Sequence, residues 1–90
     1  MVTVELVSEN ADLFTLRARV AEGRGETTHD VTLKKSDHTR LARSGESAPA
    51  FVERCFAFLL EREPKESILG RFDVSVIGRY FPEFEREIKR

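Results

Sequence analysis

Hydrophobic and polar residues alternate along three successive stretches in the first third of the chain, at 2–6, 14–20 and 27–33. In each stretch the apolar residues share one parity: Val2, Val4 and Leu6 in the first, Phe14, Leu16, Ala18 and Val20 in the second, and Val31 and Leu33 in the third. Thr27 and His29 lie on the same side of the third stretch as its apolar residues. A period of two is typical of a strand with one buried and one solvated face. Turn-forming residues at 8–12 and 22–26 separate the stretches. The pattern predicts a three-stranded antiparallel meander.

The register of the second and third strands follows from keeping like faces together. Across the glycine-containing turn, paired residue numbers must then have an odd sum. The tightest loop, Glu22 to Gly25, predicts three pairs: Leu16 with Val31, Phe14 with Leu33, and Arg17 with Asp30. The last is a surface ion pair worth at most about 1 kcal/mol, so it specifies register more than it stabilises.

The period changes near Ser36. We expect Ser36 to cap a short helix that runs to Arg43 and stops at Gly45. Ser47 is expected to cap a second helix, with Pro49 in its first turn.

The second helix carries a wide apolar stripe at helical spacing and is expected to end before Pro64. Its members are Phe51, Val52, Cys55, Phe56 and Leu59, with Phe58 and Leu60 at the edges. Three strands offer such a helix limited cover. We therefore expect it to pack on the sheet with one flank and on a second copy of the chain with the other.

The last third of the chain gives a mixed signal. Residues 64–66 favour a single turn that ends at Gly70, and the β-branched alternation over 72–77 favours a strand. Asp73 as a helix cap, with apolar residues at helical spacing after it, favours a helix instead. We prefer the helix because the spacing continues to Arg90, with a kink at Pro82. The predicted fold is one α+β domain over 1–90, a meander followed by two to four helices packed on one face.

Composition narrows the functional classes. The 90 residues are 40 % hydrophobic and 34 % charged, and 15 basic against 16 acidic residues leave a net charge of −1. No global field therefore draws the chain to nucleic acid or anionic lipid. The longest apolar run, Cys55 to Leu60, is far shorter than the ~20 residues that span a bilayer, and residues 1–10 show no secretion signal. With one cysteine and no zinc-type spacing, we expect a cytoplasmic protein without disulfide, metal or cofactor.

Few residues suit catalysis. Cys55 lies mid-helix among apolar neighbours, with no His or Lys within one helical turn to lower its thiol pKa. His29 shares parity with the buried side of its strand, and Asp37 and His38 are adjacent on a helix and so do not face each other. Since an enzyme needs several polar groups that converge on a cleft, we expect no catalytic site.

One local cluster of basic residues lies where the third strand meets the first helix. It consists of Lys34, Lys35, His38, Arg40 and Arg43, interrupted by Asp37. The free N–H groups of a helix start would add to an anion-binding site there. The alternative is a solvated turn with no ligand.

Aromatic residues gather in the second half of the chain: Phe58, Phe72, Tyr80, Phe81 and Phe84. Exposed aromatic side chains concentrate binding energy at protein interfaces. They therefore form a candidate interface, and a lid that closes the core is the alternative.

The segment from Val31 to Arg62 resembles the strand–helix–turn–helix order of ribbon-helix-helix DNA-binding proteins. The resemblance implies that Thr32 and Lys34, preceded by Asp30, would face the major groove. The acidic Asp30 and a strand already paired with its neighbour depart from that family's pattern.

The C-terminal half resembles a group of short bacterial proteins for which no activity is known. The resemblance lies in FLLEREPKESIL at 58–69, FDVSVI at 72–77 and RYFPEFE at 79–85. It implies a bacterial cytoplasmic protein of this length. We therefore expect a small non-catalytic interaction module, homodimeric through its Phe-rich helices. The alternative is a nucleic-acid or other polyanion binder that uses the basic cluster.

Overall fold

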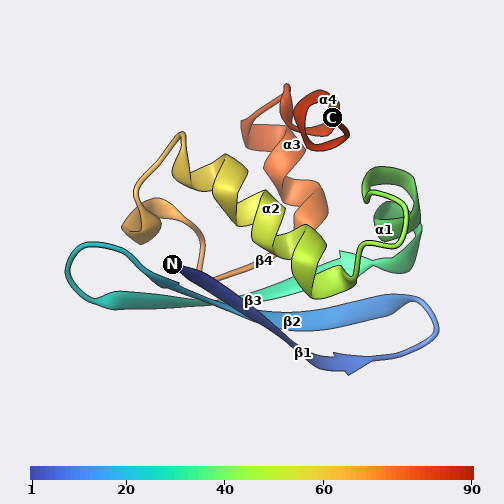
Figure 1. Ribbon diagram of the computed structural model, residues 1–90, viewed down its shortest axis with the longest axis horizontal. Helices are drawn as coiled ribbons and strands as arrows, with labels where there is room; N and C mark the ends of the chain where they lie inside the picture. The colour runs from blue at the N-terminus through green and yellow to red at the C-terminus, as the bar shows by residue number, and fades with distance from the viewer.

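A four-stranded sheet forms one layer of the protein. The structure is a computed structural model that describes residues 1–90. Its strands are β1 (Val2–Glu9), β2 (Leu13–Ala21), β3 (Glu26–Lys34) and β4 (Arg71–Asp73), in the order β1-β2-β3-β4. The first three form the predicted antiparallel meander, and β4 joins β3 in parallel (Figure 1). The fourth strand was not part of the expected meander.

The predicted register of β2 and β3 is confirmed in all three pairs. Gly23 and Gly25 take φ angles of 62° and 78°, the left-handed region that glycine enters at little cost. The turn therefore needs these glycines to bring Ala21 opposite Glu26.

Two helices follow β3. The first, α1 (Lys35–Leu41), begins and ends two residues earlier than expected and is not capped by Ser36; Lys34 occupies the cap position without a side-chain hydrogen bond. The reason is that β3 runs directly into the helix, and the Lys35 N–H donates to the Asp12 carbonyl at 2.9 Å. The second, α2 (Ala48–Leu60), begins as predicted, because Ser47 Oγ accepts from the Ala50 N–H at 3.2 Å.

The C-terminal third mixes both expected structures. The turn at Lys65–Ser67 (η1) is confirmed, and Asp73 ends β4 and caps a 3₁₀ turn, Val74–Val76 (η2). The continuous kinked helix is wrong: α3 (Ile77–Tyr80) and α4 (Phe84–Ile88) are separate. Pro82 lacks an N–H and its ring clashes with a helical carbonyl four residues back, so the chain breaks there.

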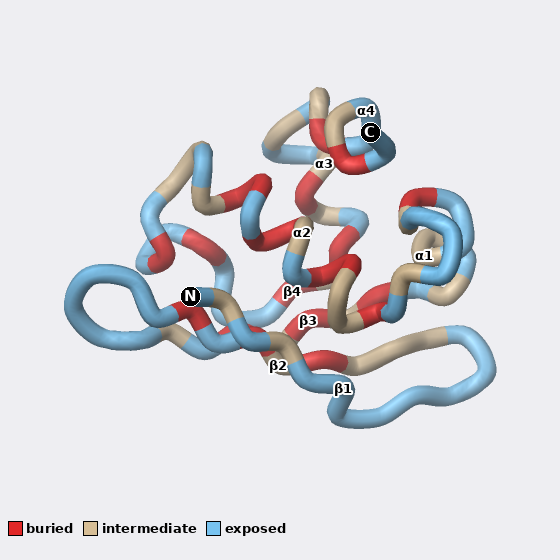
Figure 2. The backbone as a smooth tube through the Cα atoms, in the orientation of Figure 1, coloured by how far each residue is buried: buried red, intermediate tan, exposed pale blue.

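The helices cover one face of the sheet and leave the other bare (Figure 1). The core lies between these layers, where Leu16, Leu33, Phe51 and Phe56 are fully buried (Figure 2). The C-terminal segment covers the second flank of α2, with Phe58 and Phe84 ring centroids 5.1 Å apart. The chain's own C-terminal segment thus covers the flank of α2 for which a second copy was expected. None of the helices has both the length and the apolar composition needed to cross a bilayer.

Candidate interaction surfaces

Two of the residues considered for catalysis, Cys55 and His29, are buried. Burial raises the pKa of the Cys55 thiol, which keeps the sulfur protonated. His29 is also buried, with Nδ1 2.8 Å from the Leu69 carbonyl oxygen and Nε2 2.8 Å from Thr27 Oγ1. A carbonyl only accepts, so Nδ1 carries the proton and joins β3 to the segment before β4. Nowhere do three His, Cys, Asp or Glu side chains gather as metal ligands.

The five basic residues at 34–43 point to separate partners. Three of them form ion pairs: Lys34 with Asp73 at 3.0 Å, Lys35 with Glu9 at 2.8 Å, and Arg40 with both Glu85 at 2.6 Å and Asp37 at 3.0 Å. The other two lie against backbone carbonyls: His38 Nε2 is 2.8 Å from the Glu46 carbonyl oxygen, and Arg43 donates to the Arg90 carbonyl at 2.8 Å. The hydrogen bond from Arg40 lowers the pKa of Glu85. The cluster thus joins distant elements, and its charge is largely compensated within the chain.

The partners of Lys34 show this compensation clearly. Burial alone would raise the pKa of Asp73, but hydrogen bonds from Ser75, Thr32 and Lys34 outweigh it and lower the pKa. Asp73 therefore stays ionised beside the ammonium group. A hollow of about 630 Å³ lies nearby between the β1–β2 turn and the start of α1, lined by Asp12 as well as by lysines. Its mixed charge does not favour an anion.

The aromatic cluster closes the core. Phe58, Phe72 and Phe84 are buried, and Phe81 is half-buried with its ring edge-on to Phe58 at 6.0 Å. Only Tyr80, 67 % exposed, lies on the surface. The candidate interface is corrected on this point: a single exposed ring cannot form an aromatic patch, because the C-terminal helices turn the phenylalanines toward α2.

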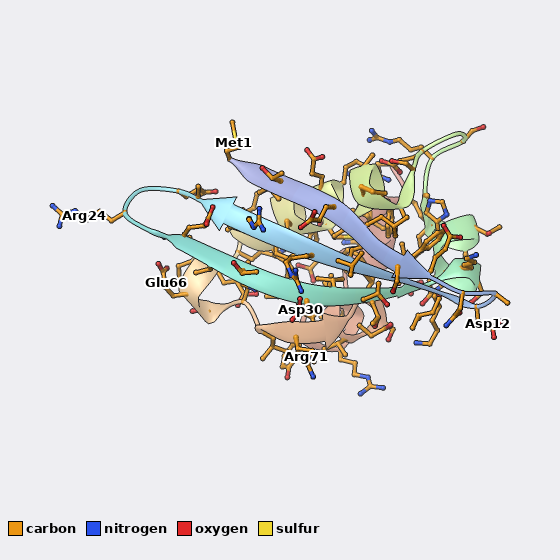
Figure 3. All side chains as sticks on the ribbon, turned by 90° about the horizontal axis from the view of Figure 1, so that it is seen from below. Met1, Asp12, Arg24, Asp30, Glu66 and Arg71 are labelled. Carbon is orange, nitrogen blue, oxygen red and sulfur yellow. The ribbon has the colours of Figure 1, made fainter.

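The bare face of the sheet carries a row of alternating charges that crosses all four strands, and Figure 3 labels two of its members, Asp30 and Arg71. Strand pairing aligns Glu5, Arg17, Asp30 and Arg71 in that order. Arg17 and Asp30 are 3.2 Å apart, and Glu5 pairs diagonally with Arg19 at 3.8 Å. None of the other side chains of this face is aromatic, so it offers no ring on which a nucleic-acid base could stack.

The outer edge of the sheet is the unpaired side of β1. Met1 and Ala21 exchange two backbone hydrogen bonds, of 2.7 and 2.9 Å. Because antiparallel pairs alternate between bonded and non-bonded types, the N–H and C=O groups of Val2, Val4 and Leu6 point away from β2. No hydrogen bond from another element reaches them.

Apolar side chains are exposed along this edge. Leu6 is 41 % and Val7 49 % exposed, and a register shift between Leu6 and Ser8 ends the regular pairing. Sequence reasoning missed this surface. The meander alone has two edges, β1 and β3, and only the pairing of β4 with β3 leaves β1 as the long free strand.

Comparison with known proteins yields no family model, curated protein or solved structure that matches the chain. The surfaces are therefore assigned from geometry alone.

Proposed function

We propose that the protein is a non-catalytic interaction module of the bacterial cytoplasm that accepts an extended strand along β1. The observation that carries the proposal is the free edge, where backbone groups at Val2, Val4 and Leu6 lack partners beside exposed apolar side chains. In strand addition, backbone hydrogen bonds provide affinity and alternate side chains provide specificity. A single buried cysteine is compatible with a reducing compartment.

The sequence of β1 leaves this edge receptive. Edge strands are usually blunted by lysine, proline or a bulge. Over 2–8, β1 has neither lysine nor proline, its only charge is Glu5, and its one irregularity comes after Leu6. The stretch Val2–Leu6 is therefore the binding segment. A partner strand would place apolar residues on the helix side and polar residues on the bare face.

Amide hydrogen exchange with an added peptide tests this function. The probe is an end-blocked alternating Thr-Val peptide with terminal lysines for solubility, and the control is the same peptide with alternate residues replaced by proline. We expect the Thr-Val peptide alone to slow exchange at Val2, Val4 and Leu6, because their N–H groups face outward. Thr3 and Glu5 already bond to β2 and should not change. Equal exchange with both peptides, at a protein concentration where the chain is monomeric, would overturn the proposal.

Sedimentation with and without duplex DNA at two salt concentrations tests the rival function. We expect no comigration with DNA, because the basic residues at 34–43 are paired internally. A complex that weakens steeply with salt would show polyanion binding through counterion release and would replace the proposed function.

A further inference from the structure

We infer that the strand accepted by β1 is β1 of a second copy, paired antiparallel about a two-fold axis that passes midway between the two Val4 residues. The inference rests on the proposed function, since it names the occupant of the same edge. Four features of the edge lead to it: length, parity, charge and exposed apolar surface.

The regularly paired segment of β1 is symmetric about its central residue. Regular pairing runs from Val2 to Leu6 and is interrupted before Ser8. Its midpoint is Val4, so a two-fold axis there opposes Val4 to Val4 and Val2 to Leu6 of the second copy. The same segment pairs over its whole length in both chains.

The alternation of outward-pointing and inward-pointing backbone groups along β1 fits that register. Val2, Val4 and Leu6 are the residues with outward backbone groups, so every opposed pair among them exchanges two hydrogen bonds. Their side chains take the parity of the helix-covered face in both copies. The two sheets then become one continuous sheet with both helix layers on one side. The exposed Leu6 side chain lies beside Val2 of the second copy.

The charges favour this register over its neighbour. The two-fold axis at Val4 places Glu5 opposite Thr3 of the second copy, whereas an axis at Glu5 would oppose two carboxylates, which is destabilising. Arg17 on β2 lies directly opposite Glu5, and Arg19 Nη2 lies 3.8 Å from Glu5 Oε1. The acid on the edge is thus compensated within its own chain and does not repel the second copy.

Such a short interface lies at the small end of specific protein contacts. We expect a reversible dimer with a dissociation constant of roughly micromolar order or weaker. Sedimentation of the intact chain from a few to several hundred micromolar should therefore show a concentration-dependent shift from monomer to dimer. Exchange at Val2, Val4 and Leu6 should slow over the same range.

Substitutions at Thr3 test the register, with Thr28 as the matched control. Both threonines are exposed on the bare face directly across from Arg19, but Thr28 lies on β3, two strands away from the free edge of β1. Thr3→Glu opposes Glu5 of the second copy twice by symmetry and should weaken the dimer roughly tenfold. Thr3→Lys should strengthen it. Thr28→Glu and Thr28→Lys meet Arg19 in the same way and should leave the dimer unchanged.

Each outcome decides between the claims. A dimer that Thr3→Glu weakens and Thr3→Lys strengthens supports the inference. A dimer insensitive to position 3, or one weakened by Thr3→Lys, overturns it. A chain that stays monomeric while the Thr-Val peptide still protects the edge also overturns it and leaves the proposed function intact. A monomer with no peptide protection removes both, and circular dichroism confirms that each variant is folded.

Discussion

Glu46 and Arg54 form a two-pronged ion pair that ties the loop before α2 to the helix itself. Arg54 Nε lies 2.7 Å from Glu46 Oε2, and Nη2 lies 2.8 Å from Oε1. The third nitrogen donates to the Ile88 carbonyl at 2.6 Å. The two side chains are only 21 % and 11 % exposed. One guanidinium thus joins the loop, α2 and the end of α4.

Removing this guanidinium should destabilise the fold. Arg54→Ala leaves Glu46 and the Ile88 carbonyl without their partner in a poorly solvated site, and we expect a loss of about 2–3 kcal/mol in the free energy of unfolding. Urea denaturation measures it. The control is Arg17→Ala, whose more exposed pair with Asp30 should cost at most about 1 kcal/mol. Equal losses in the two variants would contradict the assigned role.

The same pair makes stability depend on pH. The hydrogen bonds from Arg54 lower the pKa of Glu46 to about 2 from an ordinary 4.5. A carboxyl group whose pKa is lower in the folded state stabilises above its unfolded pKa and loses that contribution as pH falls through the folded value. The deficit of Glu46→Gln relative to wild type should therefore be full above pH 4.5 and shrink toward pH 2. Denaturation of both proteins across this range measures it, and a constant deficit would be inconsistent with the shifted pKa.

His29 should matter for stability rather than for chemistry. His29→Leu removes the hydrogen bond to the Leu69 carbonyl, and we expect a loss of about 1–3 kcal/mol. Thr28→Ala, on the same strand but exposed, should change stability by less than about 0.5 kcal/mol. Thermal and urea unfolding compare them. If the two variants were equally stable, the histidine would not hold the β4 segment in place.

The Cys55 thiol should resist modification in the folded protein. Burial raises its pKa and closes access to the sulfur. Labelling with a thiol reagent should be slow in buffer and should accelerate along the urea unfolding transition. Rapid labelling without denaturant would indicate an exposed thiol.

Much of the fold could be predicted from local pattern. Alternation identified β1, β2 and β3, and parity with a tight glycine turn placed Leu16 opposite Val31. Ser47 and Pro49 marked the start of α2. These features depend on residues close in sequence, whose spacing reports their own conformation.

The surfaces were harder to predict, because burial depends on which segments meet. Phe84 is of a residue type that is common at interfaces, yet it packs against Phe58. The two residues are too far apart in the sequence for a local periodic pattern to predict this contact. Lys34 and Lys35 suit an anion site, yet each meets an acid from another strand. Charge and aromatic clusters in the sequence became contacts within the chain.

The sequence by itself determined the three-stranded meander, its register and the start of α2, because alternation, turn glycines and helix caps act within a few residues. Only the tertiary structure decided that Arg71–Asp73 would pair in parallel with β3. That pairing brings Thr32 Oγ1 within 2.6 Å of Asp73 Oδ1, although the two residues are 41 positions apart in the sequence. It covers the β3 edge at residues 30–32 and leaves the β1 edge without a neighbouring strand. Long-range pairing depends on how the whole chain packs, and so the location of the free edge could not be read from any single segment.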